Sequence, residues 1–317
     1  MPLGGGHGIP AATLTQVAML YYRDGLTQSE IAARVNLSRA SVVNYLKLAR
    51  DSGIVEIRIN GDGFASSRLS RDLAARWGLQ AVYIAPTPAE ATHGQVISAL
   101  AEVAAIAIPD LLSPGDRLGL AWGETVQAVA EAFPIRMVPG LTVHQMVGSM
   151  HDDHLFAAEA CTFVIARRCQ ADCRTLHAPA VLGSAELAAA LRAEPIIRRQ
   201  LDQLGRLTHA LFSVGDTSAN TTLVTSGIAT AAEMAGYAAA GAQAVLCGHF
   251  IDARGQAMPT PLSDRLIGIT PAQLSSVPNR ILVAAGPDKA TATRALLCGG
   301  FVSHLMTDEA NAAILLD

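Results

Sequence analysis

Residues 27–51 read TQSEIAARVNLSRASVVNYLKLARD, and this stretch predicts two helices joined by a short turn. Thr27 and Glu30 form a capping-box pattern, in which each side chain bonds the backbone amide of the other, so a helix is expected over residues 28–35. Ser38 is the expected N-cap of a second helix over residues 39–51. Asn36 falls in the turn between them, where it tolerates a left-handed backbone.

A further helix is expected just before this stretch, over residues 14–22. Its apolar residues recur at helical spacing, and Gly25 ends it. Three short helices with a tight turn before the last are typical of a helix-turn-helix domain. The residues expected to contact DNA are Thr27, Ser38, Arg39, Ser41, Asn44 and Lys47. Arginine can form two hydrogen bonds with a guanine edge, and asparagine two with an adenine edge, whereas lysine and hydroxyl groups bind phosphate oxygens.

Two other interpretations of these helices remain open. They could form a plain packing module with a solvated surface, or a head that serves only assembly. Residues 54–61 alternate apolar and polar side chains, which predicts a hairpin arm or a connecting strand after the third helix. We place the boundary of the helix-turn-helix domain at residue 61.

The composition of the chain indicates an α/β protein. Of its 317 residues 50% are hydrophobic, 16% are charged and only 4% are aromatic. This length predicts about two domains, and this composition excludes disordered and fibrous chains. Residues 1–60 carry a net charge of +2 and the remainder −6. A basic head on an acidic body fits a nucleic-acid-binding domain joined to one that avoids phosphate.

We expect a cytoplasmic protein without a membrane partner. The apolar run over residues 99–112 is shorter than the ~18 residues a span requires, and Glu102, Pro109 and Asp110 interrupt it. Residues 1–6 lack the features of a signal peptide. The five cysteines show no disulfide framework, which suits a reducing compartment.

Residues 62–317 alternate strand and helix patterns, which predicts a wound, mostly parallel α/β domain. The expected strands are residues 81–85, 117–121, 141–147, 175–178, 209–214, 244–249, 281–285 and 302–306. The expected helices are residues 66–77, 94–112, 125–133, 155–168, 230–240, 289–297 and 309–315. Ligands of such sheets bind at the carboxyl ends of the strands, so the turns that follow strands are the expected site.

Four of these turns carry groups suited to bind a small molecule: residues 120–125, 146–149, 284–289 and 306–309. Gly123 and Thr125 offer backbone amides and a hydroxyl, and Lys289 offers a cation one turn into a helix. Any one of these turns also has a structural explanation, since glycine is common in turns after strands and Asp308 could simply cap the last helix. Together they predict an anionic or polyhydroxylated small molecule, bound by Trp122, Gly123, Glu124, Thr125, Gly148, Ser149, Asp216, Lys289 and Asp308.

In the order of its segments, the chain resembles the SorC/DeoR-type sugar-binding transcriptional regulators over residues 12–317. The matching segments are residues 26–32, the turn 119–125, residues 241–255, residues 285–290 and residues 307–310. The resemblance implies an effector domain with the fold of sugar-phosphate isomerases that has lost catalysis. It also implies a homodimer or homotetramer on operator DNA, with a sugar, often phosphorylated, as effector. Thr125 and Lys289 would then hold the phosphate or its equivalent.

Three positions depart from that family pattern. Val245 stands where relatives carry a carboxylate, His249 where they carry a basic residue, and Glu124 where a basic residue is common. A carboxylate at 124 would repel a phosphate. We therefore expect a less anionic effector, such as a free sugar or polyol, that changes operator affinity, with no cofactor, no metal and no catalytic residue.

Two alternatives assign other chemistry to the chain. His144, His151, Asp152, Asp153 and His154 crowd one segment, and Cys169, Cys173 and His177 have a spacing that could ligate zinc. The second alternative is a sugar-phosphate isomerase with an accessory head. Its general base would be Asp216, at the end of a strand.

Overall fold

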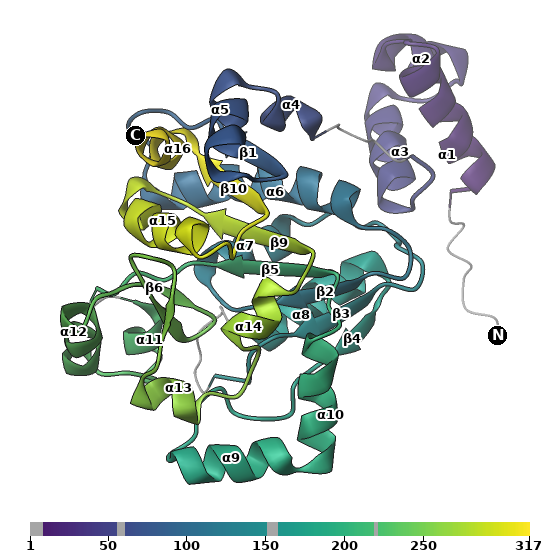
Figure 1. The fold of residues 1–317 in the computed structure, drawn as a ribbon. Helices are drawn as coiled ribbons and strands as arrows, with labels where there is room; N and C mark the ends of the chain where they lie inside the picture. The colour runs from purple at the N-terminus through teal and green to yellow at the C-terminus, as the bar shows by residue number, and fades with distance from the viewer. Residues whose placement is uncertain (1–8, 56–60, 151–157, 219–220) are drawn as a thin grey trace. The chain divides into compact units, whose positions relative to one another are not determined.

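The computed structural model describes all residues except 1–8, 56–60, 151–157 and 219–220 (Figure 1). The chain divides between Ile59 and Asn60 into two compact units, which we call the N-terminal unit and the C-terminal unit.

The N-terminal unit contains three helical segments around a small apolar core. Val17, Leu20, Ile31, Val42 and Leu46 are buried there. The segments are α1 (Ala11–Ala18), which continues as the π-helical turn η1 (Met19–Arg23), α2 (Gln28–Arg34) and α3 (Arg39–Asp51). This arrangement fits the predicted helix-turn-helix head.

The predicted caps of the N-terminal unit are confirmed. Thr27 Oγ1 accepts a hydrogen bond from the Glu30 amide at 3.3 Å, and the Thr27 amide donates to Glu30 Oε2 at 2.8 Å. Ser38 Oγ accepts from the Ser41 amide at 3.0 Å. Asn36 has the expected left-handed backbone, with φ of 54°. Most of the strand predicted over residues 54–61 lies outside the described residues, and Ile54 and Val55 form only a bend.

The C-terminal unit is built on a seven-stranded sheet in the order β1-β10-β9-β5-β2-β3-β4. Every neighbouring pair of strands is parallel, which confirms the predicted sheet type. The strands are β1 (Ala81–Ala85), β2 (Arg117–Leu120), β3 (Thr142–Gln145), β4 (Asp172–Arg174), β5 (His209–Ser213), β9 (Asn279–Ala284) and β10 (His304–Asp308).

Apolar side chains on both faces of this sheet are buried, as parallel sheets require. Val82 and Ile84 of β1 join one core cluster, while Tyr83 and Ala85 join the other. The first cluster also receives α5 (Arg68–Trp77), α15 (Ala290–Cys298) and α16 (Glu309–Leu316), and the second receives α6 (His93–Leu111), α7 (Glu124–Ala132) and α8 (Ala158–Cys169).

Helix α6 is long and apolar enough, by length and composition, to cross a membrane. Its 18-residue window has a mean hydropathy of 1.4, but 56% of that window is buried inside the domain. Leu100, Ala104 and Ile108 are fully buried against the sheet. This helix is therefore accounted for as a core helix.

Three further strands form a small antiparallel sheet, in the order β6-β7-β8. They are β6 (Ala242–Leu246), β7 (His249–Asp252) and β8 (Ala257–Met258). The predicted strand over residues 244–249 was therefore wrong in extent and in sheet. Cys247 has a φ of 50° and Gly248 one of 88°, so the chain reverses there and returns as β7.

The remaining elements connect these layers. They are α4 (Asp62–Ala65), α9 (Ala185–Ala193), α10 (Pro195–Leu204), α11 (Thr222–Thr225), α12 (Ala231–Ala239), α13 (Pro261–Arg265), α14 (Pro271–Ser275) and the 3₁₀ turn η2 (Pro287–Lys289). Helices α9 and α10 had no counterpart among the predicted elements. The strand predicted over residues 175–178 was wrong, because the edge strand β4 lies three residues earlier.

Candidate functional site

A cavity of about 410 Å³ lies at the carboxyl ends of β2, β5 and β9, and we call it the carboxyl-end pocket. Its walls are largely the turns that follow these three adjacent strands. Of the predicted effector-binding residues, the structure brings Trp122, Gly123, Glu124, Thr125, Asp216 and Lys289 together in its lining. The site therefore lies where ligands of open α/β sheets bind.

The turn after β2 has a backbone that only glycine adopts readily. Gly123 has a φ of 131°, and a side chain there would come within 2.4 Å of Ser213 Oγ. Ser213 Oγ in turn donates to the Trp122 carbonyl at 3.3 Å. Helix α7 begins at Glu124, so its first amides and the buried Thr125 face this end of the sheet.

Lys289 and Asp216 form an ion pair across the pocket. Burial lowers the pKa of Lys289, but the hydrogen bond and charge of Asp216, together with Asp288, outweigh it and raise the pKa overall. Burial likewise raises the pKa of Asp216, but hydrogen bonds from Lys289 and from Ser218 lower it overall. Both groups are therefore charged at neutral pH.

The described lining carries more negative than positive charge. Glu124, Asp216 and Asp288 are carboxylates, and Lys289 is the one ammonium or guanidinium among the described lining residues. His93 Nε2 lies 3.6 Å from Glu124 Oε2, where both side chains are half exposed. Such a lining disfavours a phosphate and suits the hydroxyl groups of a neutral ligand.

Three predicted residues do not line this pocket. Gly148 and Ser149 instead bond neighbouring chain segments: the Gly148 amide donates to the Ile267 carbonyl at 2.9 Å, and the Ser149 amide to the Ala178 carbonyl at 2.8 Å. A side chain at Gly148 would collide with the Pro179 backbone at 2.5 Å.

Asp308 is buried and caps α16. It accepts from the Ala310 amide at 3.0 Å and from the Asn311 amide at 3.1 Å. Its other oxygen accepts from the Gly286 amide at 2.6 Å. Asp308 therefore supports the turn that carries Lys289 and stands behind the pocket surface.

The sequence interpretation missed several hydroxyl-bearing residues of the lining. Ser213, Ser218, Thr221 and Thr222 all contribute to it. Thr221 Oγ1 is buried and has no hydrogen-bond partner among the described residues. A buried hydroxyl without a partner costs free energy, which a ligand hydroxyl would recover.

Two of the three departures from the family pattern, Glu124 and Val245, lie in the lining, but His249 does not. His249 Nε2 is 3.2 Å from the Ile269 carbonyl, and burial lowers its pKa to about 4. His249 therefore supplies no positive charge.

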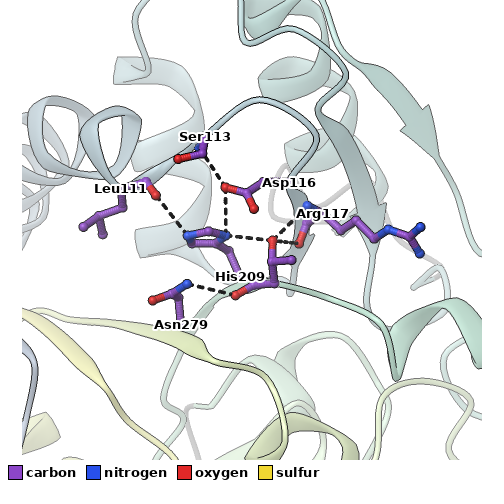
Figure 2. Close-up of polar contacts among 7 residues, drawn as sticks. Leu111, Ser113, Asp116, Arg117, His209 and Asn279 are labelled. Carbon is purple, nitrogen blue, oxygen red and sulfur yellow. Dashed lines mark hydrogen bonds and ion pairs between the residues drawn. The ribbon is translucent and has the colours of Figure 1, made fainter.

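A second polar cluster lies at the opposite, amino ends of the same strands (Figure 2). His209 Nε2 is 3.1 Å from the Leu111 carbonyl, and its Nδ1 lies 2.9 Å from Thr208 Oγ1 and 3.6 Å from Asp116 Oδ2. Asn279 donates to the Thr208 carbonyl at 3.1 Å. These bonds tie β2, β5 and β9 together, so the cluster has a structural explanation.

In the N-terminal unit, α3 exposes Arg39, Asn44 and Lys47. Ser41 is half buried and its hydroxyl lies 2.8 Å from the hydroxyl of Ser38, while Thr27 caps α2. The sequence interpretation missed Val43, which is 47% exposed and shares the outer face of α3 with Arg39 and Lys47. An exposed apolar group at this place can contact a thymine methyl.

The metal alternative finds no support among the described residues. They contain no group of three or more His, Cys, Asp or Glu side chains arranged to hold a metal ion. Cys169 is buried on α8, and His177 is exposed, with its Nε2 3.0 Å from Thr175 Oγ1. His151, Asp152, Asp153 and His154 lie outside the described residues.

Comparisons with known proteins agree with this geometry. Residues 62–317 match the family model described as "Putative sugar-binding domain". The transcriptional regulator YjhU of Escherichia coli (strain K12), named as uncharacterized, is 34% identical over 301 residues, which are 94% of this chain and 92% of that protein. The deoxyribonucleoside regulator of Bacillus subtilis (strain 168) is 28% identical over 307 residues, 95% of this chain and 96% of that protein.

The fold also matches a solved regulator. The full-length sorbitol operon regulator SorC from Klebsiella pneumoniae superposes with a TM-score of 0.73 at 23% identity, over 97% of this chain and 99% of that chain. A helical N-terminal unit, a parallel α/β unit that matches a sugar-binding family and relatives named as regulators together define a transcriptional regulator with a sugar-binding domain. The chain belongs to the SorC/DeoR family of sugar-binding transcriptional regulators.

Proposed function

We propose that this protein binds operator DNA through α3 and that a neutral sugar or polyol, bound in the carboxyl-end pocket, changes its operator affinity. One observation carries the choice of ligand. The only ammonium of the described lining, on Lys289, is neutralised by Asp216, while Glu124 and Asp288 leave the described lining net negative. A phosphate would have to enter against this charge, whereas sugar hydroxyls can bond the carboxylates and Thr221.

On the DNA side, we assign α3 to the major groove. Arg39 and Asn44 would contact base edges, and Lys47, Ser41 and the capping residues Thr27 and Ser38 would hold phosphates. The exposure of Arg39, Asn44 and Lys47 supports this assignment.

Control of DNA binding by the ligand requires that the two binding sites be thermodynamically coupled. A homodimer or homotetramer provides a route, because ligand binding can shift subunit contacts that set the spacing of two heads on paired half-sites. The protein would act in the cytoplasm and without catalysis. Asp216, the candidate base of an isomerase, is held by Lys289 and by the Ser218 amide at 2.8 Å, and its lowered pKa makes it a weak base.

The DNA part of the proposal is tested by fluorescence anisotropy of a labelled duplex from the gene's own upstream region, against a scrambled duplex. Arg39→Ala should weaken specific binding about tenfold or more, since a bidentate base contact is lost. Arg34 is exposed on α2, so Arg34→Ala removes the same charge outside α3 and serves as the matched control. Equal, weak binding of both duplexes by the wild-type protein would contradict the proposal.

The ligand part is tested by calorimetry with a panel of free sugars, polyols and their phosphate esters. We expect a neutral compound to bind and to shift the anisotropy curve, and Thr221→Val to weaken that binding. A phosphorylated sugar that binds in this pocket far more tightly than its unphosphorylated parent would overturn the assignment.

A further inference from the structure

A second cavity, of about 570 Å³, lies between α10 and the β2, β3 and β4 strands, and we call it the sheet-edge cavity. It shares no described lining residue with the carboxyl-end pocket. Figure 1 shows α10 beside β3 and β4, at the end of the sheet where β4 is the edge strand.

The floor of this cavity is a polar surface of the parallel sheet. Arg117 of β2 pairs in register with Thr142 of β3, and His144 of β3 with Arg174 of β4. Residues paired across a sheet, and residues two apart along a strand, point to the same face. These four side chains therefore share one face of the sheet. The faces of a parallel sheet are normally apolar, so this polar face is unusual.

Helix α10 forms the facing wall and is fixed in place by hydrogen bonds. Gln203 Oε1 accepts from Arg117 Nη1 at 3.2 Å. Gln200 accepts from the His177 amide at 3.1 Å and donates to the Thr175 carbonyl at 3.0 Å. Helix α10 is thus bonded both to β2 and to the segment that follows β4.

The described lining contains Arg117, Arg174 and Arg199 and no carboxylate. Arg174 pairs with Asp172 at 2.8 Å, where both side chains are largely exposed. Arg117 bonds neutral Gln203, and Arg199 Nε bonds the Pro195 carbonyl at 3.2 Å. Neither Arg117 nor Arg199 therefore forms an ion pair with a carboxylate of the described residues.

The positive charge of these arginines affects the protonation of the neighbouring His144. His144 is buried, its Nε2 lies 2.9 Å from Thr142 Oγ1, and burial together with the charges of Arg117 and Arg174 lowers its pKa to about 4. It therefore stays neutral and can donate or accept a hydrogen bond beside the guanidinium groups.

We propose that the sheet-edge cavity binds a small organic phosphate as a second ligand of this protein. Its volume lies within the range of small-molecule sites. Two unmatched guanidinium groups on facing walls suit bidentate contacts to phosphate oxygens, and Thr142, Gln203 and the neutral His144 add hydrogen-bonding groups. The two pockets thus divide the chemistry: the carboxyl-end pocket disfavours anions, and the sheet-edge cavity attracts them.

The test uses glucose 6-phosphate and inorganic phosphate as probes, with glucose and chloride as neutral and anionic controls at constant ionic strength. Calorimetry and thermal melting should show saturable binding of glucose 6-phosphate and a raised melting temperature. Arg199→Gln, on the exposed side of the cavity, should weaken binding about tenfold, because one charged hydrogen-bond donor is lost. Arg117→Gln should weaken it further.

Arg198→Gln is the matched control, because Arg198 is exposed on the same helix and does not line the cavity. It should leave phosphate binding unchanged. Three results would overturn the proposal: no saturable binding of either phosphate at millimolar concentration, equal losses in Arg198→Gln and Arg199→Gln, or a loss in Lys289→Met without one in Arg199→Gln. DNA binding by Arg199→Gln without phosphate should match the wild type, so this test is independent of the proposed operator function.

Discussion

The ammonium group of Lys289, in the turn after β9, donates a hydrogen bond to the carboxylate of Asp216, in the turn after β5. Each side chain is about one quarter exposed, so the pair is only partly screened by solvent. The pair joins two of the three turns that build the carboxyl-end pocket. Because Lys289 is already paired, the one lysine or arginine of the described lining is not available to an anionic ligand.

Asp216→Asn should therefore change both stability and ligand choice. We expect a loss of about 1–3 kcal/mol in the free energy of unfolding, between the values typical of exposed and of buried pairs. The freed Lys289 should raise the affinity of this pocket for a phosphorylated sugar relative to its parent. Urea unfolding and calorimetry measure the two effects. Asp288→Asn, 3.4 Å from Lys289 and more exposed, is the control and should have a smaller effect on both.

Gly123→Ala should destabilise the C-terminal unit by about 1–3 kcal/mol, because an L-residue is strained at this backbone conformation. It should also weaken sugar binding, since the turn positions Glu124 and Thr125. Gly94, in the first turn of α6, has open space around it and no positive φ. Gly94→Ala should be neutral or stabilise the protein by up to about 1 kcal/mol. Equal melting temperatures of the two variants would contradict the assigned role of Gly123.

Histidines inside the C-terminal unit should make the protein acid-sensitive. Burial is the main cause that lowers the pKa of His144, His249 and His304 to about 4. The unfolded chain takes up protons near pH 6.5 while the folded chain does not, so stability falls as the pH is lowered from about 6.5 to about 4. Each histidine can contribute up to about 3 kcal/mol to this loss.

Urea unfolding at about pH 7.5, 6 and 5 measures this dependence. His304→Asn, which keeps a group able to bond Ser303, should flatten the curve between pH 6.5 and 4 but not above it. An unchanged slope in this variant would show that His304 does not carry the effect.

The capping box of α2 should stabilise the N-terminal unit. Thr27→Ala removes the acceptor for the Glu30 amide and should cost about 1 kcal/mol. Ser29→Ala, two residues later and also exposed, is the control and should be nearly neutral. Thermal melting followed by circular dichroism compares them, and equal melting curves would argue against the cap.

The parts of the fold that could be predicted are those set by local sequence. Thr27, Ser38 and Asn36 act on backbone within a few residues, and the structure places them as expected. The strand β1 was predicted to the residue, because a buried parallel strand is a continuous apolar run between turn residues.

The errors have physical causes. The edge strand β4 comprises Asp172–Arg174 and lacks an apolar run, whereas apolar Leu176 and Ala178 alternate with polar residues just after it, so the sequence pattern predicts the strand three residues too late. Asp308 ends β10 and Gly148 lies just after β3, both at the carboxyl ends of strands, where site residues are expected. Asp308 instead accepts a hydrogen bond from the Gly286 amide, and Gly148 packs closely against Pro179. The sheet-edge cavity could not be predicted, because α10 meets β2 and β3 only in the folded chain.

The pairing of β1 with β10 bears on how this protein is made. Strand β1 is an edge strand whose sheet neighbour, β10, is synthesised almost a whole domain later. The contacts of the N-terminal unit, in contrast, span short stretches of chain, and domains generally fold in the order of synthesis. A nascent chain stopped before residue 304 would contain the helices to which we assign DNA binding but would lack β10, which joins β1 to the rest of the sheet. On the function proposed above, such a chain would keep its DNA contacts but would lack a complete domain to bind the ligand.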